Sequence, residues 1–224
     1  MTDAFERFGL DAEDRAAWTA AGRPEPAFED WLLDRVARRP AGARARAVYG
    51  AEEVHDFARA AILDALALGP QDRLLDVGCG GGLLLRDALA TGAAVTGLDH
   101  SQEMVRLAGE RAPGATVVRG EAEALPFDDA AFTAVSMSVV FLFLPCPVDA
   151  LRQCRRVLAP GGRLAVYTTA PELRGTPAAP EPLAGRGFFH SDGALDRFAG
   201  DAGFDAVAVT NRDGGQLLSA RRAG

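Results

Sequence analysis

The sequence predicts an open α/β fold, in which a mostly parallel sheet carries helices on both faces. The first indication is the stretch 73–91, where an apolar strand runs through a glycine turn into an apolar helix face. The second is the further alternation of strand-like and helix-like segments toward the C-terminus. The third is size, because 224 residues with 48% hydrophobic content suffice for one well-buried α/β domain but not for two large ones.

The first 72 residues are predicted to be a helical N-terminal extension, followed by the α/β domain at 73–224. We expect these helices to lie over the ligand-binding end of the sheet as a lid. Each predicted helix has a capping residue, a breaker or acidic side chains at one of its ends. The predicted helices run from Asp11 to Gly22, from Asp30 to Arg39 before Pro40, and from about Ala51 to Leu68.

The α/β domain is predicted to alternate strands with helices until a C-terminal hairpin. Its strands are short apolar runs between turn signals, and its helices have apolar residues at helical spacing. The predicted strands are 73–77, 94–98, 116–119, 132–137, 163–168, 205–210 and 216–220, and the predicted helices are 82–91, 101–111, 148–158 and 191–202.

Two connections carry turn signals. Asp213-Gly214-Gly215 joins the last two strands and is typical of a hairpin turn. Between Pro171 and Pro182 the chain has four prolines in a polar segment, which we interpret as a mobile flap near the substrate.

The glycine turn after the first strand indicates a ligand site. Gly78, Gly80 and Gly82 carry no Cβ and tolerate positive φ, so backbone N–H groups there can approach a ligand at a helix N-terminus. In open α/β sheets, ligands bind at the carboxyl ends of the strands, near the point where strand order reverses.

The spacing and the neighbouring acids distinguish this turn from a dinucleotide site. A G-x-G-x-x-G fingerprint that starts at Gly78 requires glycine at position 83, which is Leu83. Asp76 would repel a pyrophosphate and attract an ammonium or sulfonium group. Asp99 ends the next strand, where a carboxylate accepts hydrogen bonds from ribose hydroxyls. The pair of acids suits an adenosine joined to a cation.

Four segments in this order carry a family resemblance. They are Leu-Asp-Val-Gly-Cys-Gly-Gly-Gly (75–82), Gly-Leu-Asp-His-Ser (97–101), Gly-Glu-Ala-Glu-Ala-Leu-Pro-Phe (120–127) and Arg-Val-Leu-Ala-Pro-Gly-Gly-Arg-Leu (156–164). With them the chain resembles the class I S-adenosylmethionine-dependent methyltransferases, in the subgroup that acts mostly on small molecules. The resemblance implies a Rossmann-like sheet of seven strands whose last strand is antiparallel, and S-adenosyl-L-methionine as the cofactor.

The resemblance also assigns cofactor contacts. The counterpart of Asp76 reaches the methionine ammonium, commonly through water, and the amides of the glycine turn, which includes Cys79, face the amino-acid part. Asp99 is expected to bind the ribose, and His100 to lie flat on the adenine. Glu121 and Ala122 stand where the family most often has Asp-Ala, so the acid would accept from the adenine amino group.

The sequence indicates less about the pocket for the methyl acceptor. Ser136, Met137 and Ser138 end the fourth predicted strand, where the sulfonium should sit, and Ser136 is a predicted cofactor contact. Nitrogen-methylating relatives that act on amides or bases carry a polar-Pro-Pro-aromatic motif here, whereas this chain has Ser-Val-Val-Phe (138–141). Those apolar residues are either core or the wall of a pocket for an apolar acceptor.

No catalytic base is assigned from the sequence. His55 and His190 are interpreted as surface or capping residues. Methyl transfer needs little beyond alignment, because sulfonium is a strong leaving group and orientation supplies much of the rate. Tyr49 is a predicted donor or acceptor contact, and Trp31 is either such a contact or part of the core.

Composition excludes several classes. A net charge of −7 and a pI near 5.0 disfavour a nucleic-acid substrate. With no run of 18 apolar residues and no leader-like segment, we expect a soluble, cytoplasmic protein without membrane partners. The three cysteines have no metal-ligand or radical-cluster spacing, so we expect no metal site.

All 24 basic residues are arginine, which excludes a Walker lysine, a Schiff-base lysine and the Tyr-x-x-x-Lys pair of short-chain dehydrogenases. This arginine, alanine and glycine bias also indicates a G+C-rich, bacterial genome.

The sequence therefore predicts an S-adenosyl-L-methionine-dependent methyltransferase that acts on a small, neutral or apolar metabolite by in-line transfer. The acceptor atom (O, N or C), the oligomeric state and the pathway stay open. Two alternatives remain, a protein that binds the cofactor or its demethylated product without catalysis, and, less favoured, a nicotinamide-dependent oxidoreductase.

Overall fold

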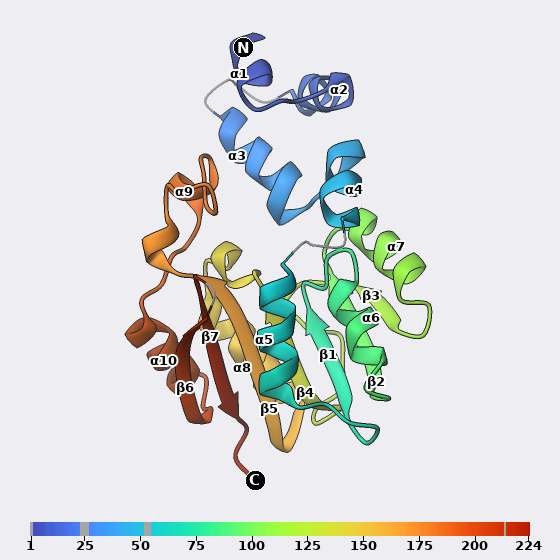
Figure 1. Cartoon of the computed structure of the whole chain (residues 1–224), viewed down its shortest axis with the longest axis vertical. Helices are drawn as coiled ribbons and strands as arrows, with labels where there is room; N and C mark the ends of the chain where they lie inside the picture. Colours follow the sequence, from blue (N-terminus) through green and yellow to red (C-terminus); the bar gives the residue numbers. More distant parts are fainter. Residues whose placement is uncertain (1, 23–26, 52–54, 213) are drawn as a thin grey trace.

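The computed structural model describes residues 2–22, 27–51, 55–212 and 214–224 (Figure 1). The predicted turn residue Asp213 and positions 52–54 of the third predicted helix lie outside these ranges.

The centre of the fold is one seven-stranded sheet with the strand order β3-β2-β1-β4-β5-β7-β6. The strands from β3 to β5 are parallel neighbours, whereas β7 runs antiparallel to both β5 and β6. The predicted Rossmann-like sheet with an antiparallel last strand is confirmed. The strands are β1 (Arg73–Val77), β2 (Ala94–Asp99), β3 (Thr116–Arg119), β4 (Phe132–Ser138), β5 (Leu158–Thr169), β6 (Asp205–Arg212) and β7 (Gly215–Arg221).

Helices surround the sheet and extend beyond its upper edge (Figure 1). Helix α2 begins after Asp11, whose side chain accepts the amide of Asp14 in a capping box, and it ends at Gly22 in the left-handed conformation, as predicted. The described helices are α1 (Thr2–Arg7), α2 (Ala12–Ala21), α3 (Phe28–Leu33), the π-helix η2 (Asp34–Arg38), α4 (Gly42–Gly50), α5 (Asp56–Leu66), α6 (Leu83–Leu89), α7 (Gln102–Arg111), the 3₁₀ helix η3 (Phe141–Phe143), α8 (Pro147–Val157), the 3₁₀ helix η4 (Pro171–Leu173), α9 (Leu183–Arg186) and α10 (Asp192–Asp201).

Each face of the sheet has its own apolar core. On one face, Ile62 of α5, Leu85 of α6 and Ala108 of α7 are fully buried in one cluster. On the other face, Leu151 of α8 and Leu195 of α10 are fully buried in a second cluster. The strands of the central sheet are therefore covered on both sides, which is why they are near-continuous apolar runs.

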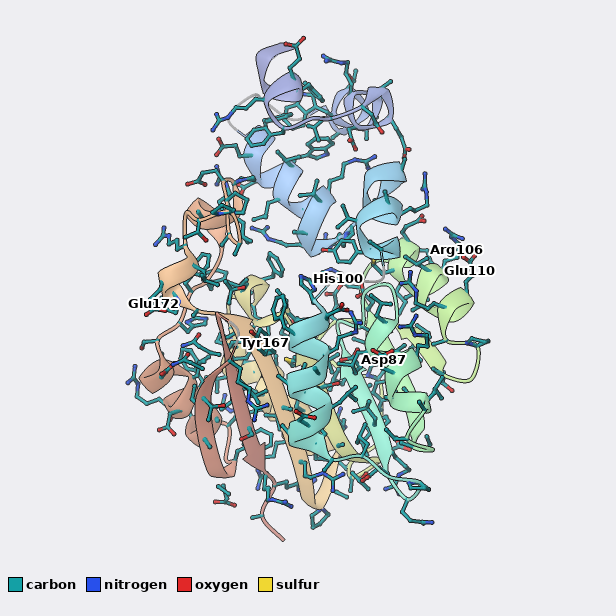
Figure 2. All side chains as sticks on the ribbon, viewed as in Figure 1. Asp87, His100, Arg106, Glu110, Tyr167 and Glu172 are labelled. Carbon is teal, nitrogen blue, oxygen red and sulfur yellow. The ribbon has the colours of Figure 1, made fainter. Side chains whose placement is uncertain are left out.

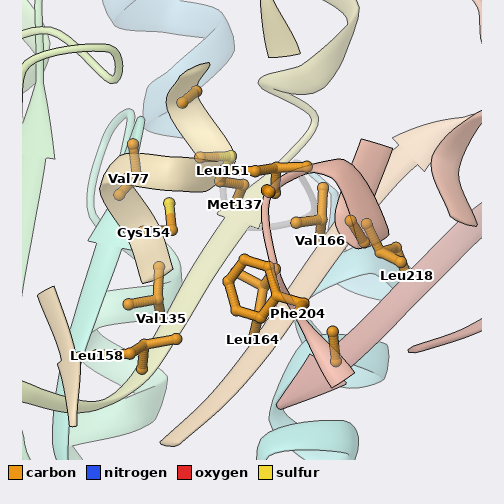
Figure 3. Close-up of a cluster of buried hydrophobic side chains, with 14 of the residues drawn as sticks. Val77, Val135, Met137, Leu151, Cys154, Leu158, Leu164, Val166, Phe204 and Leu218 are labelled. Atoms are coloured by element: carbon orange, nitrogen blue, oxygen red, sulfur yellow. The ribbon is translucent and has the colours of Figure 1, made fainter. Parts of the chain in front are cut away.

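Figure 3 shows the second cluster in detail. Val135 and Met137 of β4 and Val166 of β5 lie against Leu151 of α8, with the ring of Phe204 beside them. Because these side chains are almost completely removed from water, this face holds β4 and β5 in register. That register positions the carboxyl ends of both strands, where the cavity described below opens.

The N-terminal helices form a small core of their own above the sheet (Figure 1). Trp18 contacts Phe28 edge to face, with ring centroids 5.1 Å apart, and it contacts Trp31 at 5.2 Å. Trp31 is 8% exposed within this aromatic cluster, so its role is packing and not ligand contact.

Helix α5 differs from the expectation that all N-terminal helices lie over the ligand end. It packs along the face of β4, β5 and β7, so it belongs to the layers of the α/β sheet (Figure 1). Its buried residues Ala58, Ala61, Ile62 and Leu66 follow helical spacing and fill the groove beside α6. We call α1–α4 with η2, residues 2–22 and 27–51, the lid segment.

Candidate functional site

A cavity of about 720 Å³ opens at the carboxyl ends of β1, β2, β4 and β5, beneath the lid segment. Its size is within the range of small-molecule sites, and its place beside β1, which neighbours both β2 and β4, is where strand order reverses. Nine of the eleven predicted binding residues line it, namely Tyr49, Asp76, Gly78, Cys79, Gly80, Asp99, His100, Glu121 and Ala122.

Asp76 is a buried carboxylate at the end of β1. It is 1% exposed, and Ser136 Oγ on the paired strand β4 donates a hydrogen bond of 2.7 Å to its Oδ1. Burial raises the pKa of Asp76 to about 7, against the opposing hydrogen bond from Ser136 and with some repulsion from Asp99. Because no cation is paired with this carboxylate among the described residues, an ammonium group in the cavity would stabilise its ionised form.

Asp99 ends β2 and organises the backbone around it. Its Oδ2 accepts the amide of Gly80 at 2.9 Å, and its Oδ1 accepts the amide of Ser101 at 2.8 Å. Burial raises the pKa of Asp99, whereas these two hydrogen bonds and His100 act in the opposite direction. Asp99 therefore ties the glycine turn to the start of α7, and it also lines the cavity.

Most backbone amides of the glycine turn have hydrogen-bond partners within the protein. The amides of Gly78 and Cys79 both donate to the carbonyl of Leu98, at 2.7 and 3.0 Å. Of the amides of residues 78–82, that of Gly81 alone has no hydrogen-bond partner within the part of the chain that the structure describes. The expectation that several amides of the turn face the ligand therefore applies here chiefly to Gly81, which the sequence analysis did not single out.

Steric constraints explain two of the glycines. At Gly78, with φ of 74°, an added Cβ would lie 2.2 Å from Val140 Cγ2, so this glycine lets the end of β4 approach the turn. At Gly82, an added Cβ would lie 2.7 Å from the Cα of Ala108 in α7.

Gly82 and Ser136 do not line the cavity, unlike the other predicted binding residues. Gly82 serves the close packing of α6 on α7, as its contact with α7 indicates. Ser136 is fully buried and contacts Asp76, so it supports that carboxylate from behind. The next polar residue of β4, Ser138, lines the cavity in its place.

His100 and Glu121 face each other in the wall of the cavity. The Nδ1 of His100 lies 3.3 Å from Oε2 of Glu121, and its Nε2 contacts the carbonyl oxygen of Arg38 in η2. Figure 2 shows His100 between the sheet and the lid segment. Because Glu121 is more than half exposed, its carboxylate can exchange this partner for a ligand.

Two side chains of the α/β domain hold the lid segment to the cavity. Ser101 Oγ, which also caps α7, donates to the carbonyl of Pro40 at 2.7 Å. Arg111 Nη1 donates to the carbonyls of Tyr49 and Gly81, and its Nη2 donates to the carbonyl of Gly50. A single guanidinium therefore joins the end of α4 to the glycine turn.

Tyr49 is consequently fixed against the turn. Its Cδ1 lies 3.7 Å from the position that a Cβ on Gly80 would take, and its ring lines the cavity. Burial raises the pKa of Tyr49 to about 12, with further repulsion from Asp99, so its hydroxyl stays protonated. The tyrosine can therefore donate a hydrogen bond into the cavity.

Replacement of Arg111 by alanine is expected to loosen both the lid segment and the turn. Three carbonyl groups lose a charged donor, so we expect the free energy of unfolding to fall by about 1.5 to 3 kcal/mol. S-adenosylhomocysteine, the demethylated cofactor, should also bind more weakly, as measured by calorimetry. Arg106→Ala is the matched control on the same helix, because the ion pairs of Arg106 among the described residues are with the half-buried Glu103 and the exposed Glu110 of that helix (Figure 2). Equal effects of the two variants would contradict this role.

The opposite half of the cavity is mainly apolar, and sequence reasoning missed most of it. Its walls come from segments far apart in the chain, so no local pattern identifies them. Of the segment 138–141, Val139 and Val140 line the cavity, whereas Phe141 is fully buried core. The lining residues of this half are His55, Phe57, Ser138, Val139, Val140, Phe143, Leu144, Tyr167, Thr169, Leu173, Ala178 and Leu183.

The two histidines without an assigned role have different surroundings. His55 lines the cavity, in contrast to the interpretation of it as a surface or capping residue, and its side chain makes no cap hydrogen bond. His190 lies between the rings of Phe141 and Phe198, with centroids 5.8 and 5.1 Å away, and does not line the cavity. Burial lowers the pKa of both imidazoles.

The family comparison agrees with this geometry. Residues 75–166, from within β1 through most of β5, match the family model described as a methyltransferase domain. The match spans less than half of the chain, and it agrees with the resemblance to the class I S-adenosylmethionine-dependent methyltransferases. The matched stretch contains Asp76, the glycine turn, Asp99 and His100, which are the residues that line one half of the cavity.

The names of curated relatives describe methyltransferases that act on small molecules. The chain is 38% identical over 115 residues to a demethylmenaquinone methyltransferase of Beutenbergia cavernae, covering 50% of this chain and 48% of that protein. It is 40% identical over 108 residues to a 27-O-demethylrifamycin SV methyltransferase of Amycolatopsis mediterranei, covering 45% and 40%. The chain thus spans about half or less of the length of these relatives.

Solved structures share the fold. A phosphoethanolamine N-methyltransferase 2 of Haemonchus contortus superposes with a TM-score of 0.72 at 17% identity, covering 88% of this chain and 60% of that one. A possible histamine N-methyltransferase of Thermotoga maritima gives 0.63 at 22% identity, covering 87% and 97%. The [4+2]-cyclase SpnF gives 0.62 at 22% identity, covering 74% and 80%, so the fold alone does not decide the reaction.

Within the described ranges, none of the helices is long and apolar enough to cross a membrane. Over the same residues, no three His, Cys, Asp or Glu side chains are grouped as metal ligands.

Proposed function

We propose that the protein transfers the methyl group of S-adenosyl-L-methionine to a small-molecule acceptor in the cavity beneath the lid segment. The family of residues 75–166 and the names of the curated relatives support this reaction class. The observation that carries the proposal is Asp76, a buried carboxylate that lines the cavity and has a pKa raised to about 7 in the absence of a cation.

The residues of the cavity fit this cofactor. The ammonium group of the methionine part would pair with the carboxylate of Asp76, directly or through water. The backbone amide of Gly81, which has no hydrogen-bond partner among the described residues, would donate to the methionine carboxylate. Asp99 would accept the ribose hydroxyls, and Glu121 and the ring of His100 would contact the adenine. The bound cofactor supplies a methyl group on a sulfonium, and the protein orients it toward the apolar half of the cavity.

The arrangement does not suit a nicotinamide dinucleotide. Asp76 and Asp99 both line the cavity half in which a pyrophosphate would lie, and two carboxylates there repel it. Position 83, which the dinucleotide fingerprint requires to be glycine, is Leu83 at the start of α6.

The lid segment completes the proposal. We propose that residues 1–72 act as the cover of the α/β domain at 73–224, with the exception of α5, which packs in the sheet layers. Arg186 of α9 pairs with Glu29 and Asp30 of α3, with both N–O distances 3.1 Å, and so joins the far side of the cavity to the lid. Closure excludes water from the site of transfer, which favours alignment of donor and acceptor.

Calorimetric titration tests the cofactor. S-adenosylmethionine and S-adenosylhomocysteine are expected to bind, and NAD is not. Because the ammonium favours ionised Asp76, affinity should fall about fivefold to tenfold as the pH drops from about 7.5 to about 6, with proton release on binding at the lower pH. Titrations in two buffers of different ionisation enthalpy measure that release.

Three results would contradict the proposal. Binding of NAD alone would exclude the methyltransferase function, and binding of neither methionine derivative would exclude the cofactor. Affinity that does not vary with pH would remove Asp76 as the partner of the ammonium.

A further inference from the structure

The apolar half of the cavity presents three aromatic rings, those of Phe57, Phe143 and Tyr167, and the imidazole of His55. Phe57 of α5 and Tyr167 of β5 have ring centroids 5.6 Å apart at 57° to each other. The hydroxyl of Tyr167 donates to the carbonyl oxygen of Arg212 at 2.6 Å, so this hydroxyl already has a hydrogen-bond partner within the protein. The walls thus offer flat apolar contacts, which suit an aromatic ring in the acceptor.

Among the described residues, His55 is an ionisable group of this half whose side chain has no hydrogen bond or ion pair. Its ring lies 6.5 Å from that of Phe57 and at 73° to it. Within the described ranges no hydrogen bond to its two nitrogens is formed, and the residue lines the cavity. The backbone of His55 is in the left-handed region, with φ of 55° and ψ of 34°, a conformation that residues other than glycine adopt uncommonly.

The charged groups around His55 favour its neutral form. Arg59 follows one turn later on α5, and its guanidinium pairs with Asp56 on the same helix and with Asp87 on α6. Burial lowers the pKa of His55, and the positive charge of Arg59 lowers it further. The imidazole is therefore unprotonated near pH 7 and able to accept a proton.

A continuous set of contacts joins His55 to the glycine turn that follows Asp76. Val139, at the end of β4, donates its amide to the carbonyl of Tyr167 at 2.8 Å, and Tyr167 packs on Phe57 beside His55. Val140 lies against Gly78 in the turn that follows Asp76. The imidazole thus belongs to the wall formed by α5, β5 and the residues after β4, whereas Asp99 and His100 line the cavity at the end of β2.

We propose that His55 is the catalytic base and that the acceptor is a hydroxyl group on an aromatic ring, an inference that rests on the proposed function. The hydroxyl donates to an imidazole nitrogen of His55, and this nitrogen takes the proton as the oxygen bonds to the methyl carbon. The carbon–sulfur bond breaks, with its electron pair remaining on sulfur. The products are an aryl methyl ether, S-adenosylhomocysteine and an imidazolium, which returns its proton to water.

The test compares two probes that differ in the hydroxyl, 2-naphthol and 2-methylnaphthalene. Their dissociation constants are measured by fluorescence on the full chain, with and without saturating S-adenosylhomocysteine. In His55→Phe, which keeps an aromatic ring, 2-naphthol should lose roughly threefold to tenfold in affinity relative to 2-methylnaphthalene. In His190→Phe, the matched control outside the cavity, the ratio should stay unchanged.

The pH dependence supplies a second readout. Because only neutral His55 accepts the hydroxyl, 2-naphthol should bind the wild-type chain more weakly as the pH falls through the lowered pKa of His55, and 2-methylnaphthalene should not. The same dependence should be absent from His55→Phe.

The outcomes separate this inference from the proposed function. An unchanged probe ratio in His55→Phe, with normal binding of S-adenosylhomocysteine, would overturn the role of His55 and leave the cofactor assignment intact. Failure of S-adenosylhomocysteine to bind, with the ratio still dependent on His55, would overturn methyl transfer and keep the hydroxyl contact. Loss of cofactor affinity in His55→Phe would also contradict the inference, because His55 lies in the acceptor half.

Discussion

Replacement of Asp76 by asparagine is expected to weaken the binding of S-adenosylmethionine by about 10-fold to 150-fold. This range corresponds to about 1.5 to 3 kcal/mol, the contribution of a hydrogen bond to a charged group. Asparagine keeps an oxygen that accepts the 2.7 Å hydrogen bond from Ser136, so the local structure should persist. The loss then measures the charge that the methionine ammonium requires.

The same substitution is expected to stabilise the free protein at neutral and alkaline pH. The pKa of Asp76 rises from its ordinary value of 3.8 to about 7 on folding, so its protonated form is favoured in the folded state. Such a carboxyl contributes stability below its unfolded pKa and loses that contribution as the pH rises through the folded pKa. Asparagine does not ionise, so the advantage of Asp76→Asn should grow by roughly 2 to 3 kcal/mol between about pH 5 and about pH 8.

Urea unfolding of both proteins at the two pH values, together with calorimetry, measures these opposite effects. A variant that is less stable than the wild type at about pH 8 would show that the ionised carboxylate of Asp76 has a favourable partner in the free folded protein. A variant that binds S-adenosylmethionine as tightly as the wild type would remove Asp76 from the cofactor site.

Replacement of Asp99 by alanine is expected to affect binding and stability together. The ribose would lose an acceptor, which should weaken cofactor binding by roughly 1.5 to 3 kcal/mol. In addition, the amides of Gly80 and Ser101 would both lose the carboxylate that accepts them at 2.9 and 2.8 Å. We therefore expect the free energy of unfolding to fall by about 1 to 3 kcal/mol.

Asp72 offers the matched control for Asp99. Its carboxylate also accepts a hydrogen bond from a backbone amide, that of Gly69, at 2.9 Å. It accepts two more from the side chains of Thr133 and Arg163, each at 2.7 Å. It does not line the cavity, because it precedes β1 at the opposite end of the strand. Asp72→Ala should therefore destabilise the fold and leave the dissociation constant of the folded protein unchanged. If Asp99→Ala behaved like Asp72→Ala, the ribose assignment would be wrong.

Much of the fold follows from local pattern in the chain. The apolar runs at the central strands occupy the predicted positions, because strands buried on both faces need continuous hydrophobic side chains. Ser101 caps α7, and Asp11 caps α2, as the sequence predicts, because capping depends on residues three positions apart. Strand β5 begins earlier than predicted, at Leu158, because it pairs with Phe132 beyond a register shift that local pattern does not reveal.

The N-terminal segment was harder to predict. Helices α1 and α4 have little local signal, and the five-residue π-helix η2 continues α3 where the sequence predicts one regular helix. Their positions depend on contacts with distant residues, such as Arg35 with Asp14 at 2.6 Å and Arg111 with the end of α4. The path of α5 was set by the groove on the sheet, to which its apolar face is complementary.

The sequence by itself determined the half of the cavity that we propose for the cofactor, because Asp76, the glycine turn and Asp99 lie at strand ends whose spacing is local and chemically specific. Only the tertiary structure decided which of these groups meet the cavity. It committed most amides of the turn to Leu98 and Asp99, and it turned Gly82 and Ser136 away from the cavity. It also brought Phe57, whose ring lies near that of His55, against Tyr167, more than a hundred positions later in the chain, because the apolar half of the cavity forms only when α5 packs across β5.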